Sequence, residues 1–264
     1  MGTIKTERAF NILMATNRRH YTKTNPYQDW PQNIVPFLGI HVCLNLSSMV
    51  LSFHAYSLDA LNDKLIEGAT VLDVGSGSGY LTSCFARMVG PAGRVIGIEH
   101  IPELVEQSIA NINSDDPTLL TGGRIQFFVS DGRLGYPAAA PYDVIYVGAS
   151  TVEVPKTLLS QLKPGGRMVL PVGKYGDIQY YEQLDKQEDG TVVIKKMMRV
   201  QFIPLTDEAA QMQSPEVLGF HPHDYLVLPG YMERVSPQVL QQLPLAAPNW
   251  AEKLNSKSQD ALWE

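Results

Sequence analysis

The sequence predicts an α/β fold with a doubly wound, mainly parallel sheet and antiparallel strands at its C-terminal end. Three observations lead to this prediction. From Ala69 onward, short apolar, β-branched runs alternate with segments of helical periodicity, which is typical of βαβ units. A glycine-rich turn joins the first of these strands to the next helix. Beyond Gly173 the alternation gives way to two neighbouring strand-like runs, which indicates an antiparallel pair.

Five strands are predicted in the alternating region. Each is a short apolar run bounded by glycine, proline or polar residues, as expected for strands that are buried on both faces. They are 70–74 (TVLDV), 94–99 (RVIGIE), 124–132 (RIQFFVSDG), 142–148 (YDVIYVG) and 165–173 (GGRMVLPVG). Two further strands, 178–184 and 192–205, flank a turn at Glu188-Asp189-Gly190, and we expect them to pair antiparallel at the sheet edge.

Helices are predicted between the parallel strands. Apolar residues recur at helical spacing over 81–89, and Gly90-Pro91 ends that helix. Residues 103–113 and 154–162 give two more helices. In the helix at 103–113 we expect four residues to face the core, which are Leu104, Val105, Ile109 and Ile112.

One main domain is expected, because 264 residues that are 44% hydrophobic can bury one large core. We place this domain at residues 1–211. Residues 212–264 are rich in proline and show no sustained period, so we interpret them as a C-terminal extension. Inside the main domain the segment 35–53, VPFLGIHVCLNLSSMVLSF, is atypical, since the window 30–58 contains no charged residue.

Composition argues against several partners. The formal net charge of -6 leaves no basic stripe to neutralise phosphates, so we expect no nucleic-acid partner. The two cysteines, Cys43 and Cys84, are too few for a disulfide framework and suit a reducing compartment. The N-terminus has no apolar stretch behind its basic residues, so we expect a cytoplasmic protein without a secretory signal.

The segment VLDVGSGSGYL (71–81) carries the first chemical signal. Gly75, Gly77 and Gly79 let the backbone approach a ligand closely at the start of a helix. A dinucleotide fold has a third glycine where Tyr80 stands, which disfavours a nicotinamide-dependent oxidoreductase. The G-x-G-x-G spacing with Asp73 before it favours instead a ligand that presents an amino-acid end to the turn.

Two acidic strand ends complete the pattern. Glu99 closes the second strand, where a carboxylate can accept both hydroxyls of a ribose. Asp131-Gly132 follows the third strand, within reach of an adenine amino group. Because the carboxyl ends of successive parallel strands meet in one crevice, these residues predict an S-adenosyl-L-methionine site. The alternative is that the turn and the acidic residues are only structural.

Longer segments extend this pattern along the chain. They are IKTERAFNILMATNRRHYTKTNPYQDWPQNI, DVGSGSGYLTSCFARMVG, VIGIEHIPELVEQS, DDPTLL, DGRLGY, APYDVIYVGA, LKPGGRMVLPVG and VQFIPLTD. In this order they closely resemble the protein-L-isoaspartate (D-aspartate) O-methyltransferase family, over roughly 4–34 and 54–211. The resemblance implies a class I methyltransferase-like, Rossmann-like domain. It also implies methylation of the carboxylate exposed at isoaspartyl and D-aspartyl residues of damaged proteins, which begins their repair.

The resemblance also implies which residues contact the cofactor. They are His54, Asp73, Gly75, Ser76, Gly77, Gly79, Glu99, His100, Asp131, Gly132, Thr206 and Gln211. For His54 and His100, local packing or capping is an equally good interpretation. No metal cluster is expected, because an isoaspartyl carboxylate is already ionised at neutral pH and needs no general base. We further expect a monomer that acts on damaged proteins and does not enter a membrane.

The segment 35–53 replaces a shorter family segment with a Thr-Ile-Ser-Ala-Pro-His motif, whose serine is usually held to be catalytic. The place of that serine falls on Met49, and the neighbouring Ser48 is the candidate substitute. Three interpretations remain open: a membrane helix, a substitute wall in which Ser48 binds the substrate carboxylate, or an apolar loop over the crevice. The last predicts reduced activity. The alternative at the level of function is an inactive cofactor-binding or interaction protein.

Overall fold

The computed structural model describes residues 4–22, 26–27, 32–33, 47–48 and 51–206. All of these belong to one unit of the chain, which spans residues 4–226. The domain boundary expected at 211, and the extension after it, lie outside the described residues. Of the segment 35–53, the structure describes Ser47–Ser48 and the start of a helix at Leu51.

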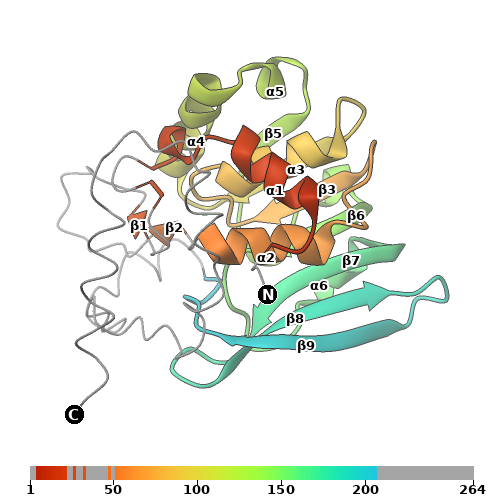
Figure 1. The fold of residues 1–264 in the computed structure, drawn as a ribbon. Helices are drawn as coiled ribbons and strands as arrows, with labels where there is room; N and C mark the ends of the chain where they lie inside the picture. Colours follow the sequence, from red (N-terminus) through yellow and green to blue (C-terminus); the bar gives the residue numbers. More distant parts are fainter. Residues whose placement is uncertain (1–3, 23–25, 28–31, 34–46, 49–50, 207–264) are drawn as a thin grey trace, which may run out of the picture. The chain divides into compact units, whose positions relative to one another are not determined.

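A seven-stranded sheet forms the centre of the fold, with the order β5-β4-β3-β6-β7-β8-β9 (Figure 1). Strands β5 to β7 are parallel, whereas β8 pairs antiparallel with both β7 and β9. The strands are β3 (Thr70–Val74), β4 (Arg94–Glu99), β5 (Ile125–Val129), β6 (Tyr142–Val147), β7 (Leu162–Val172), β8 (Gln179–Lys186) and β9 (Val192–Val200). The doubly wound α/β fold with an antiparallel end is therefore confirmed.

Helices cover both faces of this sheet. Alternate residues of β3 enter two separate cores: Val71 packs with the helices of one face, whereas Leu72 and Val74 pack on the other. The first core includes residues of α1 (Glu7–Ala15), α2 (Leu51–Leu61), α3 (Tyr80–Val89), α4 (Pro102–Asp115) and α5 (Thr118–Thr121). The second includes Leu158 of α6 (Lys156–Ser160).

Shorter elements connect these parts. The 3-10 turns are η1 (Arg18–His20), η2 (Gly132–Leu134) and η3 (Pro137–Ala139). A small antiparallel pair joins β1 (Gln32–Asn33) to β2 (Ser47–Ser48), with Gln32 opposite Ser48. Among the described residues, no helix combines the length and the apolar character needed to span a membrane.

One facing prediction and several boundary predictions are wrong, among them the strand predicted at 124–132, which spans only Ile125–Val129. Ile109 is exposed, because the inner face of α4 is formed by Leu104, Val105, Ser108, Asn111 and Ile112. The predicted helix at 154–162 is only Lys156–Ser160, since β7 already begins at Leu162 opposite Tyr142. The last strand ends at Val200 and does not continue to 205, because the chain turns back toward Ser150.

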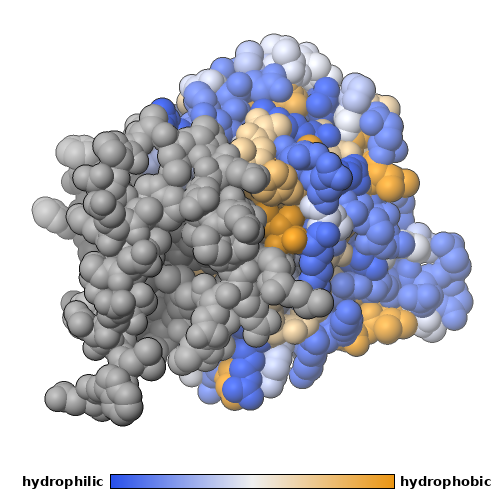
Figure 2. All heavy atoms as spheres, in the orientation of Figure 1, coloured by the Kyte–Doolittle hydropathy of each residue, from blue (hydrophilic) through white to orange (hydrophobic). Residues whose placement is uncertain are grey.

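The surface of the described part is mainly polar. Figure 2 shows hydrophilic residues over most of the coloured face, with small hydrophobic patches, one of them over the β8–β9 pair. Val193 and Ile194 of the edge strand β9 are both about half exposed, at 55% and 52%.

Candidate active site

The glycine turn between β3 and α3 has a backbone that only glycine adopts without strain. Gly75, Gly77 and Gly79 have φ angles of 76°, 55° and 79°, in the left-handed region where a Cβ is unfavourable. A Cβ built on Gly75 meets no atom within 4 Å, so this glycine faces open space. Gly79 precedes α3 and has no side chain to cap the helix. The first N–H groups of α3 therefore receive no hydrogen bond from this residue.

Helix α4 fixes the position of the turn. The Ser108 hydroxyl donates to the carbonyl of Gly77 at 2.7 Å, and the Asn111 amide donates to the carbonyl of Ser78 at 3.0 Å. Both polar side chains are buried on the inner face of α4. Apolar residues at these positions could not form the two hydrogen bonds to the turn. The turn is therefore held by side-chain hydrogen bonds as well as by its own backbone.

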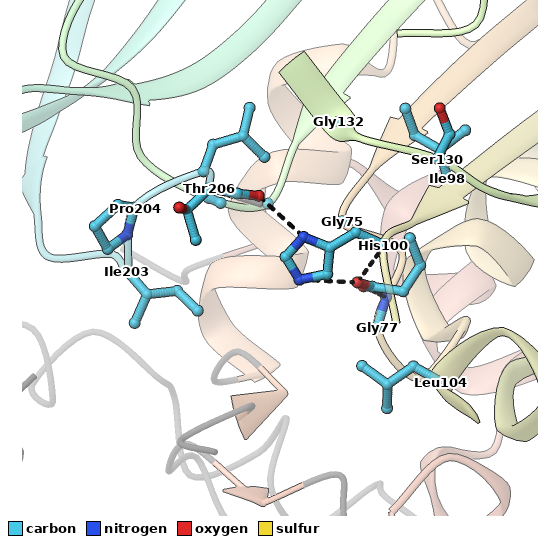
Figure 3. Close-up of a pocket in the computed structure, with 14 residues that line it drawn as sticks. Gly75, Gly77, Ile98, His100, Leu104, Ser130, Gly132, Ile203, Pro204 and Thr206 are labelled. Atoms are coloured by element: carbon cyan, nitrogen blue, oxygen red, sulfur yellow. Dashed lines mark hydrogen bonds and ion pairs between the residues drawn. The ribbon is translucent and has the colours of Figure 1, made fainter. Parts of the chain in front are cut away.

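A cavity lies beside this turn, at the carboxyl ends of β3, β4, β5 and β6 (Figure 3). Its walls come from the glycine turn, the end of β4, residues 130 and 132 after β5, residues 148–149 after β6, and the segment 203–206. This is the place where open α/β sheets bind ligands. The crevice that the sequence predicts is thus formed.

Glu99 stands at the centre of this wall. It is 7% exposed, and its carboxylate accepts hydrogen bonds from the backbone N–H groups of Gly77 at 3.2 Å and His100 at 2.8 Å. The bond from Gly77 links Glu99 to the glycine turn, whereas the bond from His100 is local, between adjacent residues at the end of β4. Glu99 therefore joins two neighbouring strand ends around the cavity.

His100 connects β4 to the segment 203–206 on the opposite wall. Its Nδ1 lies 2.9 Å from the carbonyl of Thr206, and its Nε2 lies 3.8 Å from Glu99 Oε1 (Figure 3). The segment itself is anchored to the loop after β6, since Leu205 N–H donates to the carbonyl of Ser150 at 2.7 Å. A chain segment that is distant in sequence thereby closes one side of the cavity.

Asp73 lies beneath the turn. It is 1% exposed, and the Thr82 hydroxyl donates to its Oδ2 at 2.6 Å. Burial raises the pKa of Asp73 to about 7, with a smaller contribution from the negative charge of Glu99, while the Thr82 hydrogen bond opposes the shift. Its carboxyl group therefore changes charge near neutral pH.

Asp131 forms hydrogen bonds and an ion pair with a neighbouring arginine. Its carboxylate accepts from the backbone N–H of Arg133 at 2.9 Å and from the Arg133 guanidinium, with Nη2 at 2.6 Å from Oδ2. The hydrogen bonds from Arg133 lower the pKa of Asp131. Asp131 therefore stays ionised at neutral pH next to the cavity residue Gly132.

His54 is buried in α2 against an aromatic residue that follows the glycine turn. Its ring lies 5.1 Å from that of Tyr80, and its buried Nδ1 has no hydrogen-bond partner among the residues that the structure describes. Burial lowers the pKa of His54 well below its usual value, so the imidazole is neutral. Tyr80, where a dinucleotide fold has glycine, thus packs against α2.

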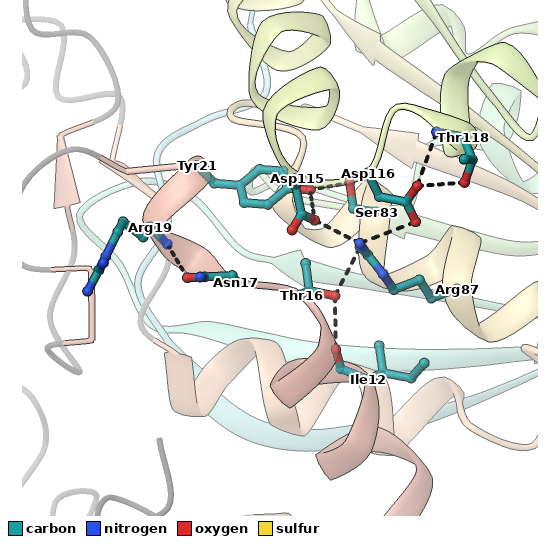
Figure 4. Close-up of polar contacts among 10 residues, drawn as sticks. All are labelled: Ile12, Thr16, Asn17, Arg19, Tyr21, Ser83, Arg87, Asp115, Asp116 and Thr118. Carbon is teal, nitrogen blue, oxygen red and sulfur yellow. Dashed lines mark hydrogen bonds and ion pairs between the residues drawn. The ribbon is translucent and has the colours of Figure 1, made fainter. Parts of the chain in front are cut away.

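Tyr80 packs against Tyr21, which belongs to a buried polar network with Ser83, Arg87 and Asp115 (Figure 4). The ring of Tyr21 packs edge-on against Tyr80, with ring centres 5.3 Å apart. The Tyr21 hydroxyl lies 2.8 Å from Ser83 Oγ and 2.7 Å from Asp115 Oδ2, and Arg87 pairs with Asp115 at 2.8 Å. These contacts fix the segment after α1 onto α3 and α4.

The model of the protein-L-isoaspartate(D-aspartate) O-methyltransferase family matches residues 1–210 of this chain. This chain belongs to that family. A protein-L-isoaspartate O-methyltransferase from Triticum aestivum is 46% identical over 80% of this chain and 89% of its own length. A relative of the same name from Caenorhabditis elegans is 41% identical over 78% of this chain and 87% of its own length.

Solved structures agree with the family. A crystal structure from Plasmodium falciparum, assigned as a protein-L-isoaspartate O-methyltransferase in complex with S-adenosyl-L-homocysteine, has a TM-score of 0.69 and 28% identity. The match covers 78% of this chain and 93% of that one. A second protein-L-isoaspartate O-methyltransferase has a TM-score of 0.65 and 25% identity, covering 76% of this chain and 62% of that one.

The residues predicted for this methyltransferase site fall into four groups. Those that line the cavity are Gly75, Gly77, Glu99, His100, Gly132 and Thr206. Those that do not line it are His54, Asp73, Ser76, Gly79 and Asp131. Gln211 lies outside the described residues. For Ser48 the structure describes only the backbone, in β2 opposite Gln32.

Several cavity residues were missed in the sequence. They are Ile98, Leu104, Ser130, Gly148, Ala149, Ile203, Pro204 and Leu205. Leu104 was predicted as a core residue only, although its position at the start of the helix that follows Glu99 was a usable signal. Ile203 and Pro204 gave no such signal, because the return of the chain to Ser150 depends on tertiary hydrogen bonds.

The residues present fit an S-adenosyl cofactor. Gly75 leaves open space at the cavity, so its backbone can approach a ligand closely. At Gly132 a Cβ would approach Val74 at 2.7 Å and Leu205 at 2.9 Å, so the wall there requires glycine. An acidic residue, Glu99, faces the position expected for a ribose.

Proposed function

We propose that this chain transfers a methyl group from S-adenosyl-L-methionine to the free carboxylate of L-isoaspartyl and D-aspartyl residues in damaged proteins, and so initiates their repair. The observation that carries this proposal is the cavity at the strand ends, with Glu99 and the glycine turn on its walls, in a chain of this methyltransferase family. The structure assigned to the family with a bound S-adenosyl-L-homocysteine supports the choice of cofactor.

Each part of the cavity has a proposed role. The glycine turn receives the amino-acid end of the cofactor, and Glu99 accepts hydrogen bonds from the ribose hydroxyls. Gly132 and the nearby Asp131 receive the adenine, and His100 with Thr206 closes the wall. The place of Ser76 between the lining residues Gly75 and Gly77 supports a contact role for it, while the roles of His54 and Gln211 stay predictions.

The reaction needs placement more than proton transfer. When bound, the cofactor supplies a methyl group that its positively charged sulfur has already activated. The substrate carboxylate has an ordinary pKa of about 4 and is a nucleophile at neutral pH. The residues of this chain therefore have to align the carboxylate and exclude water, an effect that contributes several kcal/mol.

The segment 35–53 bears on how active the chain is. Ser48 remains our candidate for the serine of the family motif, and a poorly accommodated apolar segment remains our reason to expect reduced turnover. An inactive cofactor-binding protein is the alternative function. We also propose that the protein is a cytoplasmic monomer. Size-exclusion chromatography of the full chain tests whether it is monomeric.

Two measurements separate these functions. Calorimetry with S-adenosyl-L-homocysteine reports cofactor binding, and labelled methyl transfer to an isoaspartyl peptide reports the chemistry. We expect binding together with transfer, at a lower rate than that of the Triticum aestivum relative. Binding without any transfer would support the inactive alternative, and turnover equal to the relative would contradict the impairment expected from 35–53.

A further inference from the structure

Two buried carboxyl groups lie at the ends of neighbouring strands around the cavity. Asp73 of β3 is 1% exposed and Glu99 of β4 is 7% exposed. In the part of the chain that the structure describes, neither forms an ion pair with lysine or arginine, and the nearest ring nitrogen to Glu99, His100 Nε2, is 3.8 Å away. Buried carboxylates are usually paired with a cation. Because no lysine or arginine of the described residues takes this role here, a positively charged ligand in the cavity can provide the missing charge.

Among the described residues, Glu99 is the one charged group that shifts the pKa of Asp73. Its direct contact is the neutral Thr82 hydroxyl, and its neighbours in the sheet are Gly97 and Tyr146. The titratable groups on the neighbouring elements include Glu99, Tyr146, Tyr80, Cys84 and His54, while Arg87 at the far end of α3 is paired with Asp115. Burial raises the pKa of both tyrosines and of the cysteine and lowers that of the histidine, so these four are neutral and Glu99 is the other acidic group.

The cofactor before and after transfer differs mainly in one charge. The donor carries a positive sulfur, whereas the product has a neutral thioether and is otherwise the same molecule. A fixed negative charge near the sulfur therefore favours the donor over the product, and burial strengthens the effect because the local dielectric constant is low. A carboxylate under the turn that receives the amino-acid end is placed for this role without touching the ligand.

We propose that Asp73 is a positioning residue that raises the affinity of the site for the positively charged donor relative to its neutral product. This inference rests on the proposed cofactor site and adds to it the way in which donor and product are distinguished. Because Asp73 does not line the cavity, it acts through the field of its carboxylate and through the glycine turn above it.

Protonation of Asp73 is then linked to the ligand. A cation in the cavity stabilises the ionised carboxylate, so donor binding near neutral pH drives a proton from Asp73 into the buffer. The neutral product provides no such driving force. Donor binding is expected to release more protons than product binding, and the ratio of the two affinities is expected to rise as pH increases from 6 to 8.

The test is calorimetry of the full chain with S-adenosyl-L-methionine and, separately, S-adenosyl-L-homocysteine, in two buffers with different ionisation enthalpies. In wild type we expect excess proton release with the donor. Asp73→Asn, which keeps an acceptor for Thr82, is expected to remove this excess and to lower the donor-to-product affinity ratio about tenfold. Asp189→Asn, in the exposed turn between β8 and β9, is the control and should leave both quantities unchanged.

The outcomes separate this inference from the proposed function. If wild type binds neither ligand, the cofactor site itself is wrong. If both ligands bind but Asp73→Asn keeps the wild-type ratio and proton release, the role of Asp73 is overturned. If Asp73→Asn does not fold, the wild-type pH series decides: a ratio that rises between pH 6 and 8 supports the inference, and a constant ratio contradicts it.

Discussion

Glu99 shows how one side chain can organise a site before any ligand arrives. Its carboxylate already accepts backbone N–H groups from Gly77 and His100, so its position does not depend on the cofactor. The same arrangement leaves lone pairs for ribose hydroxyls. This residue could be predicted from its place at the end of a strand, whereas its bond across to Gly77 could not, because it depends on the register of β3 and β4.

Replacing Glu99 tests its role as a ribose ligand. Glu99→Gln keeps the size of the side chain but loses the charge of the acceptor, and hydrogen bonds to charged groups contribute about 1.5 to 3 kcal/mol. We expect the affinity for S-adenosyl-L-homocysteine to fall about 10- to 100-fold, measured by calorimetry. Glu103→Gln, on the exposed side of the first turn of α4, is the matched control and should bind normally.

Asp73 predicts a pH dependence of stability. Its folded pKa, about 7, lies above the ordinary value of 3.8, so folding favours the protonated form. The contribution of Asp73 to the free energy of unfolding is therefore greatest below pH 3.8 and decreases as the pH rises to about 7, by up to about 4 kcal/mol in total. Thermal unfolding should therefore show a larger gain from Asp73→Asn at pH 8 than at pH 5. An equal gain at both values would contradict the shift.

At the scale of elements, the site depends on the turn between β3 and α3 and on the segment that closes it. The sequence predicts β3 and β4 with their bounds, because both are buried on two faces and end at glycine or acidic residues. It does not predict that β9 ends at Val200. That ending depends on Gln179, whose amide bonds both backbone groups of Phe202, a contact far from any local signal.

Two glycine substitutions can distinguish the effect of backbone strain from an effect on cofactor binding. Gly75→Ala and Gly190→Ala both place a Cβ at positive φ, 76° and 84°, without meeting a neighbouring atom. Each should lower the free energy of unfolding by about 1 kcal/mol, measured by urea denaturation. Only Gly75→Ala should also weaken binding of S-adenosyl-L-homocysteine. Equal binding by both variants would remove Gly75 from the cofactor site.

For the whole molecule, the packing of the N-terminal segment against α3 and α4 connects the outer layer to the site. Tyr21, Arg87 and Asp115 form this connection through buried polar contacts. The sequence shows a family resemblance here but no pattern that predicts the pairing, because the three residues come from separate elements. The segment 35–53, which most affects expected activity, lies largely outside the described residues.

The Arg87–Asp115 ion pair should contribute strongly to stability. The two side chains are 13% and 6% exposed, so Arg87→Met leaves a buried carboxylate without its cation. We expect a loss of about 3 kcal/mol or more in the free energy of unfolding. Lys163→Met removes the partner of Asp143 in a more exposed pair and should cost less than about 1 kcal/mol. Equal losses would show that Asp115 has another compensating partner.

The most direct measurement is methyl transfer to two peptides that differ only in one residue, L-isoaspartate or L-aspartate. The full chain is incubated with each peptide and S-adenosyl-L-methionine, and the products are analysed by mass spectrometry before and after mild base. The proposed function predicts a base-labile methyl ester on the isoaspartyl peptide alone. No ester on either peptide, in a preparation that binds S-adenosyl-L-homocysteine, would contradict it.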